Sequence, residues 1–374
     1  MTETQRDEFR FIASQTALEG LCGELRDAPW LGLDTEFERS RTFYAELCLV
    51  QIAAPGVLAC IDPFAVESLA PLIDVLALGT ATKQLHAARQ DLEVLYQVDG
   101  RLPVSLLDTQ IAAGLAGFAD NIGYADLVQQ LLGIALDKSQ TRTDWRQRPL
   151  TSAQLEYAAA DVLHLAPITA LLDDKLASLG RSAWLREDCR ALLAPENYQQ
   201  APATAWQRLR GLSNLALEAQ ARAVALAAWR ETTARSRNLP RGWVLKDDEL
   251  LALASKVPAN APELAARLAN NGNVRRHAEA ILDILHAARA ADAPRAARRL
   301  TSAGRAELKR LSARAQDIAQ RLGIAPSILV TRRELEVLVC GETPPRLRDG
   351  WRGPELAELV ELRAETSDES LWEF

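Results

Sequence analysis

Short apolar runs alternate with helical patterns through the first third of the chain. Six runs are rich in aliphatic and β-branched residues, and turn residues or helix-like stretches separate them, as expected for the strands of an α/β sheet. The runs are Phe9–Ala13, Leu31–Glu36, Glu46–Ala53, Val57–Ile61, Lys83–His86 and Val104–Leu107. The second, third and fourth runs have hairpin-like spacing, which predicts that part of the sheet is antiparallel.

The pattern becomes helical from Asn121 onward. The segment Ala194–Ala203 interrupts it with prolines and polar residues, a composition typical of an interdomain linker. More helical sequence follows, and its alanine- and arginine-rich residues 287–300 are best interpreted as a second linker or a helix edge. The chain therefore predicts an α/β domain followed by all-helical modules.

Two acidic residues interrupt the second apolar run. Asp34 and Glu36 are two positions apart, so in a strand their side chains project from the same face. Carboxylates held so close repel and desolvate each other unless a cation lies between them. Mg²⁺ is a natural counter-charge because it prefers oxygen ligands. A solvated acidic strand face is the more common explanation of a single Asp-x-Glu pair, so a metal site requires partners elsewhere.

Candidate partners occur at two later positions. The segment Lys83–Leu95 reads as a strand that leads into a helix, with Asp91 in the first helical turn. Thr151 can cap a later helix on which Tyr157 and Asp161, four residues apart, share one face. Taken alone, an acid at the position of Asp91 is more often a helix-start residue, and a Tyr and an Asp four residues apart most often make a local surface contact.

Together, Asp34, Glu36, Asp91, Tyr157 and Asp161 resemble the tyrosine-containing branch of the four-carboxylate (DEDD) 3′-5′ exonuclease superfamily. The sequence around these residues is similar to one family of this superfamily, ribonuclease D. The segments that carry this similarity are Leu33–Phe37 (LDTEF), Leu49–Ile52 (LVQI), His86–Glu93 (HAARQDLE), Leu107–Gln110 (LDTQ), Asp137–Thr151 (DKSQTRTDWRQRPLT) and Glu156–Asp161 (EYAAAD). The four carboxylates and the tyrosine are all present, which favours an active enzyme.

The resemblance implies a domain organisation. Residues 1–195 are expected to form a ribonuclease-H-like exonuclease domain, with a mixed sheet flanked by helices. Residues 203–288 are similar to the helicase-and-ribonuclease-D C-terminal (HRDC) domain, mainly through Trp229–Leu250. Residues 293–374 are expected to be a second, degenerate HRDC-like helical domain, because Leu347–Gly353 (LRDGWRG) is again typical of the family.

The resemblance also implies a chemistry. Asp34, Glu36, Asp91 and Asp161 would hold two divalent metal ions, Mg²⁺ or Mn²⁺, and Tyr157 would orient the attacking water. A phenol with a pKa near ~10 is a poor base at neutral pH, which favours this positioning role. The expected activity is that of a 3′-5′ exoribonuclease that releases nucleoside 5′-monophosphates. The expected substrates are the 3′ ends of tRNA precursors and other structured RNAs.

The metal site itself does not distinguish RNA from DNA, because neighbouring polar groups read the 2′-hydroxyl. The candidate substrate-binding residues lie beside the acidic pair and before the last motif; they are Thr35, Phe37, Lys138, Gln140, Trp145 and Arg148. A buried role for Trp145 is an equal alternative. His86, near Asp91, is interpreted as a packed residue rather than a metal ligand.

The net charge of −7 is unevenly distributed. Residues 1–200 hold 16 Lys and Arg against 28 Asp and Glu, whereas residues 201–290 hold 13 against 8. A basic module beside an acidic catalytic one can hold a polyanion, although an ordinary solvated helical surface explains the excess too. The loop Arg235–Arg241, near Trp243, is suited to phosphate contacts and stacking; the alternative makes Trp243 a core anchor.

The remaining sequence features define the setting. Five scattered cysteines without a C-x-x-C pair are interpreted as reduced thiols. The polar start of the chain and the lack of a long uninterrupted apolar run favour a cytoplasmic protein without a membrane partner, and we expect a monomer. Two other functions remain open. A DNA 3′-5′ exonuclease is one, although the chain has no Gly-x-x-x-x-Gly-Lys-Ser/Thr loop; a noncatalytic RNA-binding protein with an exonuclease-like fold is the other.

Overall fold

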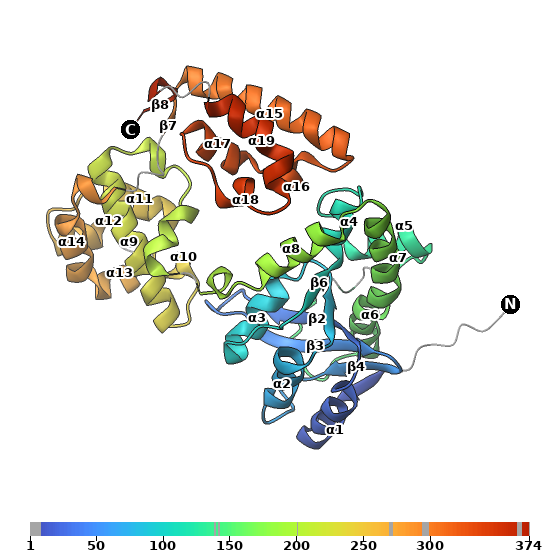
Figure 1. The fold of residues 1–374 in the computed structure, drawn as a ribbon. Coiled ribbons are helices and arrows are strands. Elements are labelled where there is room, and N and C mark those ends of the chain that lie inside the picture. Colours follow the sequence, from blue (N-terminus) through green and yellow to red (C-terminus); the bar gives the residue numbers. More distant parts are fainter. Residues whose placement is uncertain are drawn as a thin grey trace.

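The computed structural model describes residues 9–137, 140, 143–199, 201–268, 272–293, 299–364 and 369–373. An α/β unit comes first, and two mainly helical modules follow it, the second with a short two-stranded sheet (Figure 1). The first helical module lies beside the α/β unit, and the second returns to contact its far end (Figure 1). The predicted fold class is confirmed.

A six-stranded mixed sheet forms the centre of the α/β unit, in the order β1-β4-β3-β2-β5-β6. The strands are β1 (Arg10–Ile12), β2 (Trp30–Glu38), β3 (Glu46–Ala54), β4 (Val57–Ile61), β5 (Thr82–Leu85) and β6 (Leu106–Asp108). Strands β2, β3 and β4 are successively antiparallel, as their hairpin-like spacing predicted, whereas β5 and β6 extend the sheet in parallel with β2.

Eight helices accompany this sheet in the described chain. They are α1 (Gln15–Leu25), α2 (Ala70–Leu78), α3 (Arg89–Asp99), α4 (Thr109–Leu115), α5 (Tyr124–Leu132), α6 (Ser152–Leu163), α7 (Leu165–Ser178) and α8 (Ser182–Leu192). Helix α6 begins as predicted at Thr151, whose side chain and that of Gln154 form a reciprocal capping box. Helix α3 carries Asp91 in its first turn, also as predicted.

The first helical module has a hydrophobic core of its own, built around Leu226, Leu250 and Ile281. After the short turn η1 (Pro195–Asn197), its elements are η2 (Pro202–Arg208), η3 (Leu212–Asn214), α9 (Leu217–Ser236), α10 (Arg241–Val244), α11 (Asp247–Ser255), α12 (Ala261–Arg267), α13 (Gly272–Arg276), α14 (Ala278–Ala287) and η4 (Ala290–Asp292). Because its core is separate, this module is a distinct folding unit.

The second helical module shares one continuous hydrophobic core with the α/β unit. Its elements are β7 (Arg299–Leu300), α15 (Ser302–Leu322), α16 (Pro326–Leu329), α17 (Arg332–Val339), α18 (Pro345–Arg348), α19 (Arg352–Ala364), η6 (Glu369–Leu371) and β8 (Trp372–Glu373). The two units approach closely at Gly114 of α4, where a Cβ atom would come within 2.7 Å of Ile328.

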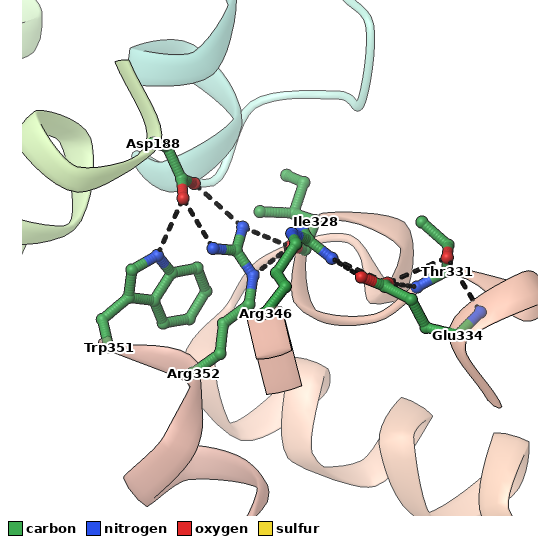
Figure 2. Close-up of polar contacts among 7 residues, drawn as sticks. All are labelled: Asp188, Ile328, Thr331, Glu334, Arg346, Trp351 and Arg352. Atoms are coloured by element: carbon green, nitrogen blue, oxygen red, sulfur yellow. Dashed lines mark hydrogen bonds and ion pairs between the residues drawn. The ribbon is translucent and has the colours of Figure 1, made fainter. Parts of the chain in front are cut away.

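Side chains of α8 also contact the second helical module. The rings of Trp184 and Trp351 stack with their centroids 4.1 Å apart. Figure 2 shows Arg352 between Asp188 and the carbonyl oxygen of Ile328, with hydrogen bonds to both. Apolar burial and buried polar pairing therefore fasten the second helical module to the α/β unit.

The cysteines and the most apolar helical stretch bear on where the protein resides. All five cysteines are free thiols, and four of them are buried. One described stretch, Ser152–Ser178, is long and apolar enough to count as a candidate membrane span, with a hydropathy of 1.3. Here it is α6 followed by α7, and 39% of its most apolar window is buried. A buried core helix meets the same criterion, so this stretch is weak evidence for a membrane.

Candidate active site

Three carboxylates meet between β2 and α6. Asp34 and Glu36 project from the same face of β2, and Asp161 reaches them from the last turn of α6. One carboxylate oxygen from each lies within 4.8 Å of the others, and all three side chains are partly exposed. Three oxygen ligands so close together form a donor set that suits a hard divalent cation.

Gly32 allows α6 to lie close to β2. It precedes Asp34 by two residues and therefore shares its face of the strand. A Cβ atom at Gly32 would stand 3.3 Å from side-chain atoms of Ala53 and Leu165 and 3.4 Å from the Val162 carbonyl oxygen. A larger residue would push the helix outward and carry Asp161 away from the β2 carboxylates.

Asp91 approaches the group from α3, which contacts the opposite face of β2. The hydroxyl of buried Thr35 donates a hydrogen bond of 2.5 Å to Asp91 Oδ1. Thr35 alternates with Asp34 and Glu36 along the strand, so one short segment places two carboxylates and orients a third. A register shift between Glu36 and Phe37 in the β2–β3 pairing occurs at the same point, and such irregularities re-aim side chains near active sites. We call Asp34, Glu36, Asp91 and Asp161 the acidic cluster.

Burial and mutual repulsion raise the pKa values of the acidic cluster. Burial, then the charges of Asp91, Asp161 and Glu36, hold the pKa of Asp34 well above its usual range. Burial and the charges of Asp161 and Asp91 raise the pKa of Glu36 to about 8. Burial raises the pKa values of Asp91 and Asp161 to about 7 each. Carboxylates under this strain gain most from a multivalent cation, so the residues fit a metal.

Tyr157 lies one helical turn before Asp161, on the same side of α6. Its ring is partly exposed and packs at a tilt against the indole of Trp145, with centroids 6.3 Å apart. Trp145 is 5% exposed and belongs to a small buried cluster with Cys48 and Ala158. The structure thus favours a buried packing role for Trp145, in which its indole contacts the Tyr157 ring.

The other candidate substrate contacts have mixed positions. Arg148 uses all five guanidinium N–H groups inside the protein: two on Asp62 and three on the carbonyl oxygens of Cys48, Trp145 and Gln147. It fastens the segment before α6 to the sheet and keeps no N–H for a substrate.

The Thr35 hydroxyl likewise donates its hydrogen bond within the protein, to Asp91. Phe37 and Gln140 are partly exposed, and Lys138 lies outside the described residues. Phe37, Gln140 and Lys138 therefore stay predictions as substrate contacts.

Sequence reasoning missed two residues beside the cluster. Tyr124 of α5 accepts a hydrogen bond from the His164 amide and donates to the Ala160 carbonyl, at the end of α6 that carries Asp161. Gln51 lies directly across from Asp34 in the β2–β3 pairing and is completely buried. Neither polar atom of its side chain has a hydrogen-bond partner within the described part of the chain. The LVQI segment was the only sequence signal for Gln51.

His86 has the packed role that its surroundings suggested. Its ring nitrogens lie 2.9 Å from the Thr109 hydroxyl and 2.9 Å from the Ile122 carbonyl oxygen. Burial lowers its pKa, although the charge of Asp108 opposes the shift. A neutral imidazole with both nitrogens engaged connects β5 to α4 and is not available as a ligand.

Protein-family profiles and individual relatives agree with this geometry. A profile described as 3′-5′ exonuclease matches residues 9–177, and the HRDC domain profile matches residues 219–285. Ribonuclease D of Granulibacter bethesdensis is 37% identical over 370 residues, covering 94% of this chain and 92% of the relative. Ribonuclease D of Escherichia coli K12 is 34% identical, covering 94% and 97%.

The chain belongs to the ribonuclease D family. A crystal structure of Escherichia coli RNase D, described as an exoribonuclease involved in structured RNA processing, superposes with a TM-score of 0.84. That match has 32% sequence identity and covers 96% of this chain and 99% of the other. This ribonuclease D family member is a 3′-5′ exoribonuclease, and its converging Asp34, Glu36 and Asp161 carboxylates suit a divalent metal ion.

Proposed function

We propose that the enzyme holds two divalent metal ions, Mg²⁺ or Mn²⁺, with Asp34, Glu36, Asp91 and Asp161 as the ligands. The convergence of Asp34, Glu36 and Asp161 within 4.8 Å carries this proposal. Asp91 joins them because its charge is the largest electrostatic influence of a neighbouring residue on Asp34. Four carboxylates can balance two divalent cations, so bound ions would offset the repulsion among these charges.

The residues divide the catalytic work among themselves. Bound divalent ions supply charge neutralisation and a water that ionises near neutral pH. The four carboxylates would bind these ions side by side, and Thr35 orients Asp91 by its hydrogen bond. Tyr157 positions the attacking water through its hydroxyl, and Trp145 holds the ring in place. Hydrolysis then breaks the last phosphodiester bond at its 3′-oxygen side and releases a nucleoside 5′-monophosphate.

The proposed substrates are the 3′ ends of tRNA precursors and other structured RNAs. The structural relative from Escherichia coli is described as acting in structured RNA processing. The positive excess in residues 201–290 supports a polyanion partner. We propose an exonuclease domain at 1–195, an HRDC domain at 203–288 and a degenerate HRDC-like domain at 293–374. We further propose a cytoplasmic monomer, since five free thiols suit a reducing compartment.

The test is a comparison of matched substrates. Purified protein is incubated with an end-labelled tRNA carrying a 3′ extension, and with DNA of the same sequence, in Mg²⁺, Mn²⁺ or EDTA. We expect stepwise shortening of the RNA from its 3′ end, release of 5′-mononucleotides and no reaction in EDTA. Faster digestion of the DNA would favour the DNA exonuclease, and binding without cleavage in either metal would favour the noncatalytic alternative.

A further inference from the structure

A pocket of about 360 Å³ lies where the first helical module meets the α/β unit. Phe43, Tyr44 and Tyr96 line it from the α/β side. Arg208, Arg235 and Arg241 line it from the helical side. Its volume is in the range of small-ligand sites, and its walls combine cations with aromatic rings.

The three arginines gather around one buried carboxylate. Arg241 bonds Glu231 through Nε at 2.5 Å and Nη2 at 2.9 Å, and Arg235 bonds it through Nη2 at 2.9 Å. Arg208 Nη1 lies 3.7 Å away. Glu231 is 1% exposed, whereas the Arg208 and Arg241 side chains are 42% and 36% exposed. The carboxylate therefore lies behind the guanidinium groups and the arginines face the pocket.

Two carboxylates do not neutralise the four arginines at this pocket, because Glu231 faces Arg208, Arg235 and Arg241 while Glu93, a carboxylate that lines the pocket, pairs with Arg39. Burial would raise the pKa of Glu231, but hydrogen bonds and charges from Arg241 and Arg235 lower it overall, so Glu231 stays ionised. Burial, and then the charge of Arg241, lower the pKa of Arg208. Like charges are thus held together against their repulsion, and an anion in the pocket would relieve it.

Aromatic rings accompany these charges. The guanidinium carbons of Arg241 and Arg235 lie 4.5 Å and 5.4 Å from the centroid of the Phe43 ring. Tyr44 meets Phe43 edge to face at 4.9 Å and keeps 41% of its surface exposed. Phe43 holds the arginines in orientation, and Tyr44 offers a ring on which a base can stack.

The two sides of the pocket are joined by hydrogen bonds. Asn238 Oδ1 accepts from the amides of Phe43 and Tyr44, at 3.1 and 3.0 Å. The pocket is also connected to the acidic cluster through β2. Arg39 pairs with Glu93, a pocket residue, at 3.0 Å, and it lies three residues beyond Glu36. Glu36 and Glu38, the last residue of β2, are two strand residues or roughly 7 Å apart, and Arg39 follows directly.

We propose that this pocket binds an upstream phosphate and its base in the RNA strand whose 3′ end occupies the acidic cluster. Arg208 and Arg241 contact the phosphate, and the base stacks on Tyr44. The inference rests on the proposed action on RNA and adds a specific contact site to it. Through this pocket, the first helical module would contact the same RNA strand that enters the active site.

The experiment compares substrate lengths in the full-length enzyme. Arg208→Gln and Tyr44→Leu are assayed on a 12-nucleotide single-stranded RNA and on a dinucleotide, which is too short to span both sites. Both variants should raise KM for the 12-mer about tenfold and remove most of its advantage over the dinucleotide. Arg208→Gln alone should reduce the steepness of the salt dependence of 12-mer affinity by about one. Arg332→Gln, an exposed arginine of the second helical module, is the charge-matched control.

Two results would overturn the proposal. One is an unchanged 12-mer KM and salt slope in both variants; the other is an equal loss on the 12-mer and the dinucleotide. Equilibrium binding of the 12-mer in EDTA, followed by fluorescence anisotropy, provides a readout that does not depend on catalysis. If the wild-type enzyme cleaved no RNA, the proposed function would fall, while a tenfold binding difference between wild type and Arg208→Gln would still support the pocket.

Discussion

Arg352 of α19 and Asp188 of α8 form a two-pronged ion pair across the contact between the second helical module and the α/β unit. The Nη1–Oδ1 and Nη2–Oδ2 distances are 2.6 and 2.8 Å (Figure 2). Arg352 is 2% exposed, and Trp351 Nε1 donates a third hydrogen bond to Asp188. Because docking of the module buries this pair, the stability lost when the pair is broken tests whether the module stays docked in solution.

Replacing Arg352 by Gln should destabilise the whole protein. The change leaves the Asp188 carboxylate without its cation, and breaking a buried pair from one side typically costs about 3 kcal/mol. Urea unfolding of the full chain measures the loss. Arg348→Gln is the matched control, because Arg348 pairs with Asp349 at the exposed surface, where solvent screens the interaction and its contribution to stability is small. Similar effects of the two variants would mean that the module is not docked as described.

Truncation after residue 200 should yield a less stable exonuclease domain. The deletion removes Trp351 from its stack on Trp184 and Ile328 from its contact with Gly114, so apolar surface of α4 and α8 becomes exposed. We expect a lower melting temperature and increased binding of a hydrophobic dye. A truncated domain that melts at the temperature of the full chain would show that the shared core contributes little.

Asn substitutions at Asp34 and Asp161 should separate catalysis from folding. Each change keeps the size of the side chain but removes a ligand charge. Loss of a residue that only supports a ligand costs about 10- to 100-fold, so loss of a ligand should lower turnover by at least about a hundredfold. In the metal-free protein the melting temperature should be equal to or above that of wild type, because one repulsive charge is gone. Steady-state kinetics and thermal melts in EDTA measure the two effects. Near wild-type turnover in either variant would exclude the proposed ligand set.

The acidic cluster should make the metal-free enzyme less stable as pH rises from about 5, above the range in which the carboxyl groups with lowered pKa values titrate, to about 8. Folding raises the pKa of Glu36 to about 8 and those of Asp91 and Asp161 to about 7, so in this range the native state holds more protons than the unfolded state. Stability falls with pH wherever that is true. Mg²⁺ stabilises the ionised carboxylates, so it should raise the melting temperature more at pH 8 than at pH 6. An equal rise at both pH values would contradict this linkage.

Tyr157→Phe should lower kcat and leave RNA affinity nearly unchanged. The variant deletes only the hydroxyl proposed to orient the attacking water, and the ring keeps its contact with Trp145. Single-turnover rates and binding in EDTA distinguish the two quantities. A loss confined to binding would make Tyr157 a substrate contact instead.

Local sequence determined the secondary structure and the candidate ligands. The six strands occur where alternating apolar runs predicted them, and Thr151 caps α6 because capping depends on a few adjacent residues. The spacing of Asp34 and Glu36 in a strand, and of Tyr157 and Asp161 on a helix, placed each pair on one face. Such periodicities are properties of the backbone and survive any tertiary arrangement.

Only the tertiary structure decided which polar groups are used internally. The sequence predicts Arg148 as a substrate contact, whereas in the structure all five of its N–H groups donate to Asp62 and to backbone carbonyl oxygens. Thr35 bonds Asp91, 56 residues away, and Glu231 gathers arginines that the sequence indicated only as a basic loop. Residue type states what a side chain can bind, whereas its partner depends on which distant segments fold against it. The docking of the second helical module was hidden for the same reason, since a shared core arises from contacts between segments far apart in the chain.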